Sequence, residues 1–200
     1  MNFYEAADSL SGPILQVHEW IQEAQDGKVA LPHAMNIASL DSAGRPTSRM
    51  VLLKRISEEG FVFFTDYEGN KGKQILTFPH VALTFWWAKT NKQIRIEGEC
   101  SKVSEKENDE YFSSRPRGSQ ISASVSLQSQ ELESYESLTQ KSESFEKEHS
   151  NKTIERPERW GGFIVAPISI EFWIDQKNRL HKRELYSKSG TDWKKALLSP

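Results

Sequence analysis

The chain has 200 residues, of which 26 are lysine or arginine and 28 are aspartate or glutamate, so its formal net charge is −2. This length predicts a single domain, and the near-zero charge argues against bulk electrostatic binding of nucleic acid or an anionic membrane. No apolar run is long enough to span a bilayer and residues 1–7 lack an export-signal pattern, so we expect a cytoplasmic protein without membrane spans. Because Cys100 is the only cysteine, we expect neither an internal disulfide nor a multi-thiolate zinc site.

Helix and hairpin patterns open the chain. An N-terminal helical segment is expected within residues 1–30, because Gly12-Pro13 precedes apolar residues spaced at 14, 17, 21 and 24. Residues 35–40 and 50–53 flank a turn cluster and predict a β-hairpin. Further strand patterns occupy 61–65, 81–87 and 93–103, with a short helix at 71–78. Strands this closely spaced predict an antiparallel sheet or closed barrel.

The second half predicts a helical insertion at 105–150 and C-terminal strands at 160–200. Glu105–Ser114 has helical character, and a thin apolar stripe from Leu132 to Phe145 indicates a solvated surface helix rich in Glu and Ser. Strands are expected at 162–165 and 168–174 on either side of Pro167, at 185–186 and near the C-terminus. The expected architecture is one domain, 1–200, mainly β with flanking helices.

Several kinds of chemistry are excluded by missing motifs. The histidines at 18, 33, 80, 149 and 181 lack metal-binding spacing, so no metal site is predicted. The chain also lacks a dinucleotide-binding glycine motif, a complete phosphate-binding loop and a nucleophile elbow. A nucleotide fold of these types and covalent serine catalysis are therefore not expected.

One cluster of candidate binding residues surrounds Pro116. Tyr111, Arg115 and Ser119 recur every fourth residue and would share one face of a continuous helix. Pro116 disfavours helical angles at Arg115, so the alternative is a helix end that opens into a loop. Either geometry brings hydroxyls and a guanidinium together, which suits a phosphate dianion. Spacing alone is equally compatible with Arg115 and Arg117 as ordinary surface charges.

A second cluster follows Trp173. If the chain is extended there, Arg179, His181 and Arg183 point to one face. The flanking arginines favour a neutral imidazole that can exchange hydrogen bonds near neutral pH. A third, weaker feature is the strand Arg49–Lys54, which begins and ends on a cation.

Together, and in this order, these motifs resemble the pyridoxamine 5′-phosphate oxidase family. The likeness extends from about Gly12 to Pro200. It implies a split β-barrel homodimer that binds two FMN molecules in clefts between subunits and oxidises pyridoxamine or pyridoxine 5′-phosphate with dioxygen, yielding pyridoxal 5′-phosphate and hydrogen peroxide. The motifs are Arg49-Met-Val-Leu-Leu-Lys54, Gln93-Ile-Arg-Ile-Glu-Gly98, Tyr111-Phe-Ser-Ser-Arg-Pro-Arg-Gly-Ser-Gln120, Gln128-Ser129, Trp160-Gly-Gly-Phe163, Ile170-Glu-Phe-Trp173 and Arg179-Leu-His181-Lys-Arg183.

The resemblance also implies a set of site residues. The phosphate, ribityl chain and flat ring of FMN call for cationic, polar and aromatic side chains, and this set supplies all three. Substrate would be held by Lys54, Tyr111, Arg115 and Ser119, with Arg179 and His181 as catalytic residues over the reacting carbon. The implied FMN contacts are Arg49, Met50, Val51, Leu52, Leu53, Lys54, Phe64, Thr65, Asn70, Lys71, Gln93, Gln128, Ser129, Trp173 and Arg183.

Three segments depart from the pattern of the family. Asn70 stands where an arginine is usual, which removes one cation from the loop implied to hold the FMN phosphate. Ser122-Ala-Ser124 stands where Gly-Ala-Trp is common. Lys182 replaces the usual aspartate between His181 and Arg183 and changes the local charge by two units.

Alternative functions differ in their use of these residues. A related split-barrel flavin oxidase, as in phenazine pathways, would act on another small molecule; such relatives tend to lack the Arg-Pro-Arg segment, so its presence here favours a phosphorylated substrate. A non-catalytic FMN-binding module is a second alternative. The third is a small barrel that binds single-stranded nucleic acid through Trp86, Trp87, Lys89 and Lys92. For the tryptophans we favour the barrel core and a dimer interface.

Overall fold

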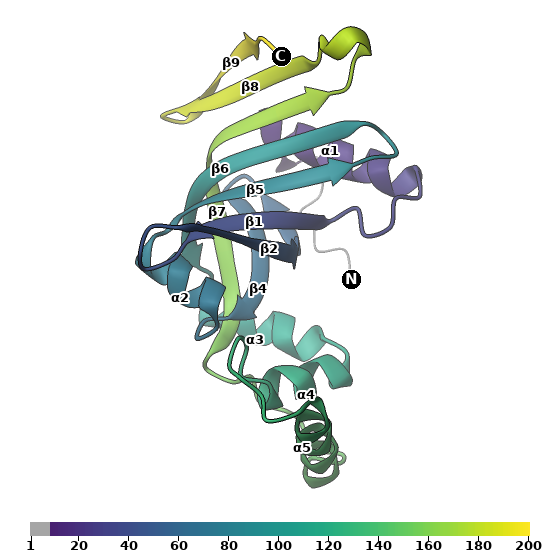
Figure 1. Cartoon of the computed structure of the whole chain (residues 1–200), viewed down its shortest axis with the longest axis vertical. Coiled ribbons are helices and arrows are strands. Elements are labelled where there is room, and N and C mark those ends of the chain that lie inside the picture. Colours follow the sequence, from purple (N-terminus) through teal and green to yellow (C-terminus); the bar gives the residue numbers. More distant parts are fainter. Residues whose placement is uncertain (1–8) are drawn as a thin grey trace.

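An antiparallel β-sheet organises the chain, as the computed structural model in Figure 1 shows. The structure describes residues 9–200, so the first eight residues of the expected N-terminal helical segment lie outside the described residues. The strands are β1 (Ala34–Leu40), β2 (Pro46–Leu52), β3 (Arg55–Ser57), β4 (Gly60–Asp66), β5 (His80–Trp87), β6 (Lys92–Lys102), β7 (Trp160–Ile174), β8 (Lys182–Ser189) and β9 (Asp192–Leu198). Their order is β2-β1-β5-β6-β7-β4-β3, and β8 pairs with both β7 and β9.

Alternating burial along the central strands builds the main core. Leu83 lies opposite Ile96 and Phe85 opposite Ile94 in the β5–β6 register, and all four side chains are fully buried. Phe85 is therefore a core residue, and so is Trp87, which is only 2% exposed and donates from its indole nitrogen to a backbone carbonyl oxygen. The nucleic-acid surface considered for the tryptophans is wrong for Trp87, and Lys92 is paired with a glutamate of the first helix.

Two helices lie along the strands. Helix α1 (Gly12–Asp26) begins beside the expected Gly-Pro and buries Ile14, Val17 and Ile21 on one face. In Figure 1 it lies behind the sheet. Helix α2 (Asn70–Thr77) follows β4 and ends before Pro79. No helix within residues 9–200 has the length and apolar character needed to cross a membrane.

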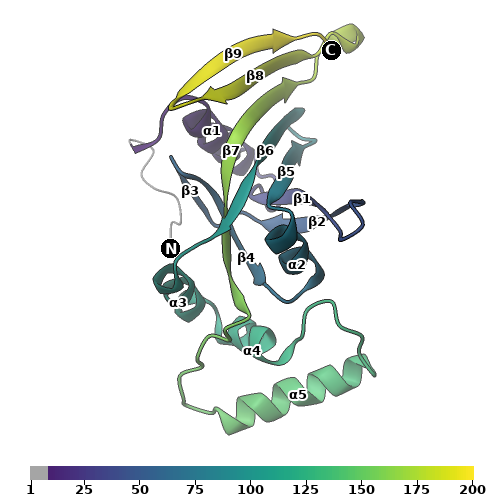
Figure 2. The ribbon, with the colours of Figure 1, turned by 90° about the vertical axis from the view of Figure 1, so that its left-hand side faces the viewer.

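Three further helices lie at one end of the sheet, and two of them, α3 and α4, contribute to a second, smaller core. They are α3 (Glu105–Ser114), α4 (Arg117–Val125) and α5 (Tyr135–Glu148). Phe112, Ile121, Ile154 and Trp160 are buried together there. Helix α5 has no buried residue, which confirms the expected solvated helix. Figures 1 and 2 place these helices at the opposite end of the molecule from β8 and β9.

The secondary structure around Pro116 and Pro167 differs from what the sequence predicts. A continuous helix through Arg115 is wrong, because α3 ends at Ser114 and Arg115 is extended (φ −71°, ψ 149°) before α4 begins. This is the conformation that a following proline favours, but a second helix replaces the expected loop. Two separate strands around Pro167 are also wrong, because β7 runs through it and the β6–β7 register shifts at Gly98.

Candidate functional site

One cavity of about 430 Å³ collects most of the expected substrate and cofactor residues. It lies where β2, β4 and α2 meet the helices α3 and α4, and its volume is within the usual range for small-molecule sites. Pro116 and Trp160 also line it and were not predicted as site residues, although Trp160 belongs to one of the quoted motifs. The lining residues are Met50, Val51, Leu52, Lys54, Phe64, Thr65, Lys71, Tyr111, Arg115, Pro116, Ser119, Gln128 and Trp160.

Aromatic rings form one wall of this cavity. Phe64 stacks on Tyr111 with ring centroids 3.9 Å apart and lies 5.4 Å from Trp160 in a nearly parallel arrangement. The register of β4 and β7 places Phe64 opposite Gly162, where a Cβ atom would come within 2.8 Å of the Phe64 ring. The glycine therefore gives this ring its position. Flat apolar walls of this kind suit planar ligands.

Two cations in the cavity are poorly compensated. Arg115 lies over the Trp160 ring at 4.4 Å, and its Nη1 atom is buried without a hydrogen-bond partner among residues 9–200. Burial lowers the pKa of Arg115. Burial also lowers the pKa of Lys54, and the Arg115 charge lowers it further. A buried donor without a partner and two like charges in one cavity indicate a binding place for an anion.

Arg117 has a different environment, although it is only two residues from Arg115. Its Nε donates to Glu146 at 2.9 Å, and its terminal nitrogens donate to the carbonyl oxygens of His149 and Lys152. The surface role that the sequence left open therefore applies to Arg117. It does not apply to Arg115.

Arg49 lies in a second cationic group, at the start of α2. Its guanidinium donates to Ser39 Oγ at 2.7 Å, Thr47 Oγ1 at 2.7 Å and Gln74 Oε1 at 2.9 Å. None of these partners is acidic, and no carboxylate within residues 9–200 forms an ion pair with Arg49. The polar cage orients the guanidinium and leaves its charge available to an anion.

Lys71 completes the second cationic group. Its Nζ donates to Thr65 Oγ1 at 2.8 Å and to Gln128 Oε1. Burial lowers the pKa of Lys71 to about 8, with a further lowering from Arg49 that Asp66 opposes. Burial and the Arg49 charge both disfavour the charged form of Lys71, and a bound phosphate dianion would favour it.

The loop before α2 is closely fitted to the segment after α4. The Asn70 backbone N–H donates to Ser129 Oγ at 3.3 Å, so these two expected FMN residues lie side by side. A Cβ atom at Gly69 would lie 2.9 Å from Gln128 Oε1, so only glycine leaves that side chain in place. Leu53 differs from the other expected contacts, because its side chain is buried in the main core.

The remaining expected residues form a second group, which we call the C-terminal group: Gln93, Trp173, Arg179, His181 and Arg183. The strand registers place Gln93 opposite Trp173 and Trp173 opposite Arg183, so the three lie in one row across β6, β7 and β8. The Trp173 and His181 rings are 4.6 Å apart. Arg179 has a left-handed backbone (φ 61°) in a short turn, and β8 begins only at residue 182. The expected extended run from 179 is therefore wrong.

Polar partners hold the C-terminal group in place. Arg183 makes two bonds to the buried Glu171 carboxylate, at 2.7 and 3.1 Å, and Arg95 lies 3.0 Å from the same carboxylate. His181 Nδ1 lies 3.0 Å from Asp175 Oδ1. Lys182 pairs with Glu184 at 2.8 Å. Its charge is thus directed to a neighbouring strand residue.

The cavity and the C-terminal group lie at opposite ends of one strand. Trp160 lines the cavity and Trp173 belongs to the C-terminal group, and both are on β7. Thirteen steps of an extended strand span roughly 40 Å. Figures 1 and 2 show the ends of β7 at the two ends of the molecule. A single chain therefore does not bring the two groups together.

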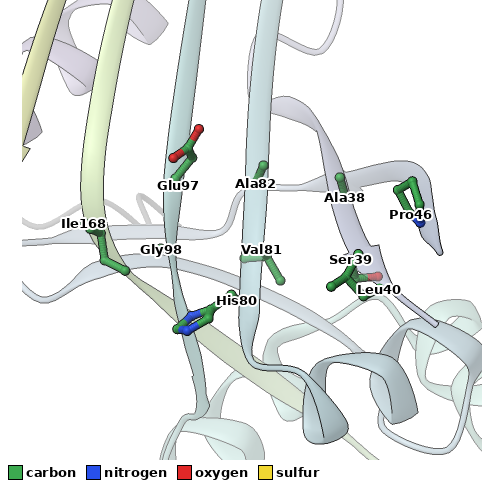
Figure 3. A pocket seen from close by; sticks show the side chains of 10 residues that line it. All are labelled: Ala38, Ser39, Leu40, Pro46, His80, Val81, Ala82, Glu97, Gly98 and Ile168. Atoms are coloured by element: carbon green, nitrogen blue, oxygen red, sulfur yellow. The ribbon is translucent and has the colours of Figure 1, made fainter. Parts of the chain in front are cut away.

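A second cavity, of about 400 Å³, lies on neighbouring strands of the sheet (Figure 3). Its lining is mainly small or apolar, as at Ala38, Ala82, Gly98 and Ile168, with His80 and Glu97 at its edge. No expected site residue belongs to it. The candidate site is therefore the first cavity, with its aromatic wall and the cations Lys54, Lys71 and Arg115, together with the neighbouring Arg49.

Comparison with known proteins places this geometry in a family. A family model described as pyridoxamine 5′-phosphate oxidase matches residues 21–148, and one described as the pyridoxine 5′-phosphate oxidase C-terminal dimerisation region matches residues 160–200. The pyridoxine/pyridoxamine 5′-phosphate oxidase of Nostoc punctiforme is 45% identical over 190 residues, covering 94% of this chain and 88% of that protein. The protein of the same name from Haemophilus influenzae (strain 86-028NP) is 44% identical over 193 residues, covering 96% and 91%.

Solved structures agree with this assignment. PhzG from Burkholderia lata 383, in complex with tetrahydrophenazine-1-carboxylic acid, matches with a TM-score of 0.90 at 30% identity, covering 96% of this chain and 95% of that one. A pyridoxamine 5′-phosphate oxidase-related, FMN-binding protein from Nostoc punctiforme shares the fold, with a TM-score of 0.76 at 14% identity, covering 96% and 100%. The expected family and fold class are confirmed, and the chain belongs to the pyridoxamine 5′-phosphate oxidase family.

Proposed function

We propose that this chain is an FMN-dependent oxidase that converts pyridoxamine and pyridoxine 5′-phosphates to pyridoxal 5′-phosphate, with dioxygen as electron acceptor and hydrogen peroxide as second product. One observation carries the proposal: two cationic groups meet at a single cavity. Arg115 and Lys54 line it together, and Lys71 lines it with Arg49 nearby, outside the lining. A phosphorylated substrate and FMN each bring one phosphate dianion. The two groups supply a place for each.

The residues around Lys71 fit the phosphate end of FMN. Arg49 and Lys71 would neutralise the phosphate, and Ser129 and Gln128 would contribute a hydroxyl and an amide to it or to the ribityl chain. Bound FMN supplies the redox chemistry of the reaction, so the chain needs no covalent nucleophile of its own. The task of the protein is to position and to stabilise charge.

The residues around Arg115 fit the phosphate of the substrate. Arg115 offers paired donors, Lys54 adds a second positive charge, and the hydroxyls of Ser119 and Tyr111 line the same cavity. An anion bound here would satisfy the buried Nη1 atom of Arg115 and remove the repulsion between the two cations. The Phe64 and Trp160 rings border the space left for the substrate ring.

The C-terminal group would come from a second subunit. The matched dimerisation region, residues 160–200, contains four of its members, and the family forms homodimers through it. Because the two groups lie at opposite ends of β7, the proposed site combines the cavity of one subunit with Trp173, Arg183, Arg179 and His181 of the other. FMN would then lie at the subunit interface.

Subunit complementation tests this arrangement. Arg115→Met damages only the cavity, and Arg179→Ala damages only the C-terminal group. If each site draws on both subunits, a mixed dimer of the two variants contains one intact site, so random mixing should restore about a quarter of wild-type activity. If one chain supplied the whole site, the mixed dimer would contain no intact site and activity would stay at the level of the separate variants.

Two assays test the alternative functions. The protein should be yellow as purified, and its colour should bleach on anaerobic addition of pyridoxamine phosphate; a yellow protein that does not bleach would be a non-catalytic FMN-binding module. Pyridoxamine without its phosphate should turn over poorly, since it leaves Arg115 and Lys54 uncompensated. Equal turnover of the two compounds would favour an oxidase for another small molecule.

A further inference from the structure

Asp66 and Arg159 form a largely buried ion pair that does not line the cavity. Asp66 is the last residue of β4, and Arg159 directly precedes β7. Arg159 Nε lies 3.0 Å from Asp66 Oδ2, with side-chain exposures of 17% and 6%. Because the pair is largely buried, removing either side chain would leave an unpaired buried charge, which is strongly destabilising.

Asp66 fixes the loop that leads into α2. Its Oδ1 accepts hydrogen bonds from the Glu68 N–H at 2.8 Å and the Gly69 N–H at 3.2 Å. Gly69 is the N-cap of α2 and has no side chain, so the Asp66 carboxylate orders the two residues that directly precede the helix. The same loop continues into Lys71, which the proposed function assigns to the FMN phosphate.

Arg159 fixes the other side, at the end of α4. Its Nη2 donates to three carbonyl oxygens, of Ala123 at 2.8 Å, Ser124 at 2.9 Å and Ser126 at 3.2 Å. These are carbonyls that a helix end leaves without intrahelical partners. Helix α4 carries Ser119 near its start, and the chain after it carries Gln128 and Ser129.

We infer that Asp66 and Arg159 are a positioning pair that links the FMN-phosphate loop to the substrate-phosphate helix. One carboxylate orders the loop before Lys71, and one guanidinium holds the end of α4 against that carboxylate. Neither residue is in the cavity lining, so neither is a catalytic residue. The inference rests on the proposed function, because that proposal assigns the loop to FMN and α4 to the substrate.

The test measures both affinities in variants of the pair. Arg159→Gln removes the charge, and Asp66→Asn keeps the shape and one carbonyl oxygen for the loop amides. Each should raise both the FMN dissociation constant, measured by flavin fluorescence on apoprotein, and the KM for pyridoxamine phosphate at saturating FMN, by roughly fivefold or more. We expect kcat to stay within about twofold, because reacting atoms are untouched. The double variant should be no worse than either single variant.

Arg117→Gln is the matched control. Arg117 also joins one carboxylate to the carbonyls at a helix end, but at α5 and the start of α4. It should lower the melting temperature and leave the FMN dissociation constant within about twofold. Arg159→Lys, which keeps a charge for Asp66 but cannot reach all three carbonyls, should give intermediate values.

The outcomes separate the inference from the function on which it rests. Wild-type protein that binds no FMN would overturn both. If the wild type binds FMN and turns over pyridoxamine phosphate, two results would overturn the positioning role alone. In the first, variants of the pair change only the FMN dissociation constant or only the KM. In the second, they change both no more than Arg117→Gln does. If Arg159→Gln fails to fold, the two constants measured for Asp66→Asn decide whether the pair has the positioning role.

Discussion

Replacing Arg115 with methionine separates a binding role from a structural one. In the free protein Arg115 is half-buried, its buried Nη1 atom has no hydrogen-bond partner within residues 9–200, and its charge lowers the pKa of Lys54. Methionine has a similar length and can keep the packing against Trp160. The substitution therefore removes the charge with little loss of contact.

The stability of the FMN-free protein should change little. Removing an unsatisfied buried donor recovers about 1–3 kcal/mol, and losing the contact between the cation and the Trp160 ring costs about 0.5–2 kcal/mol. The estimated change in the free energy of unfolding therefore lies between a loss of about 1 kcal/mol and a gain of about 2.5 kcal/mol. Affinity for pyridoxamine phosphate should fall by about 1.5–3 kcal/mol, or roughly ten- to a hundredfold.

Denaturant unfolding of apoprotein and steady-state or binding assays of holoenzyme measure the two effects. Arg117→Met is the control, since it breaks bonds to Glu146 and two carbonyl oxygens and should cost about 1–2 kcal/mol of stability. A loss of more than about 2 kcal/mol in Arg115→Met, or unchanged affinity for pyridoxamine phosphate, would refute the reasoning. Flavin content should survive the substitution.

Three further predictions concern the other charged groups. Burial lowers the pKa of Lys71 to about 8, so between pH 8 and the ordinary value of 10.5 the unfolded chain binds more protons than the folded chain. The contribution of Lys71 to apoprotein stability should therefore rise with pH across that window, while FMN affinity falls. In Lys71→Met, pH titrations should show neither trend. Glu171→Gln releases Arg183, and fluorescence titration should show FMN affinity reduced by roughly tenfold. Lys182→Met removes an exposed cation from the buried Glu184, which keeps Lys195 as a partner at 3.0 Å, so the anaerobic rate of flavin reduction should stay within about twofold.

Local patterns predicted most of the secondary structure because burial alternates with a clear period. The hairpin of β1 and β2, the strand β5 and the helix α3 all occur at or within a few residues of their expected places. Helix α4 was missed because its sequence, Arg117–Val125, is rich in serine and has one buried residue. Tertiary bonds from Arg159 and Arg117, which no local pattern reveals, help to hold it in place.

The sequence predicted which residues gather at the candidate site better than it predicted how they are arranged in space. Resemblance supplied the site residues, and the cavity brings together Lys54, Tyr111, Arg115 and Ser119 as expected for a phosphate. The separation from the C-terminal group could not come from sequence, because it depends on the long unbroken course of β7 through Pro167. The roles of the individual residues stay predictions until variants are measured.

A site divided between two subunits links FMN binding to dimerisation. If FMN contacts Lys71 of one chain and Trp173 of the other, it binds the dimer more tightly than the monomer, and by reciprocity it must strengthen the dimer by the same free energy. Dilution of holoenzyme should then release FMN together with monomers, and excess FMN should move the dimer-to-monomer transition to lower protein concentration. Sedimentation and flavin fluorescence over one dilution series measure both quantities. An FMN affinity that does not change while the dimer dissociates would show that each chain binds FMN by itself, and the shared site would have to be abandoned.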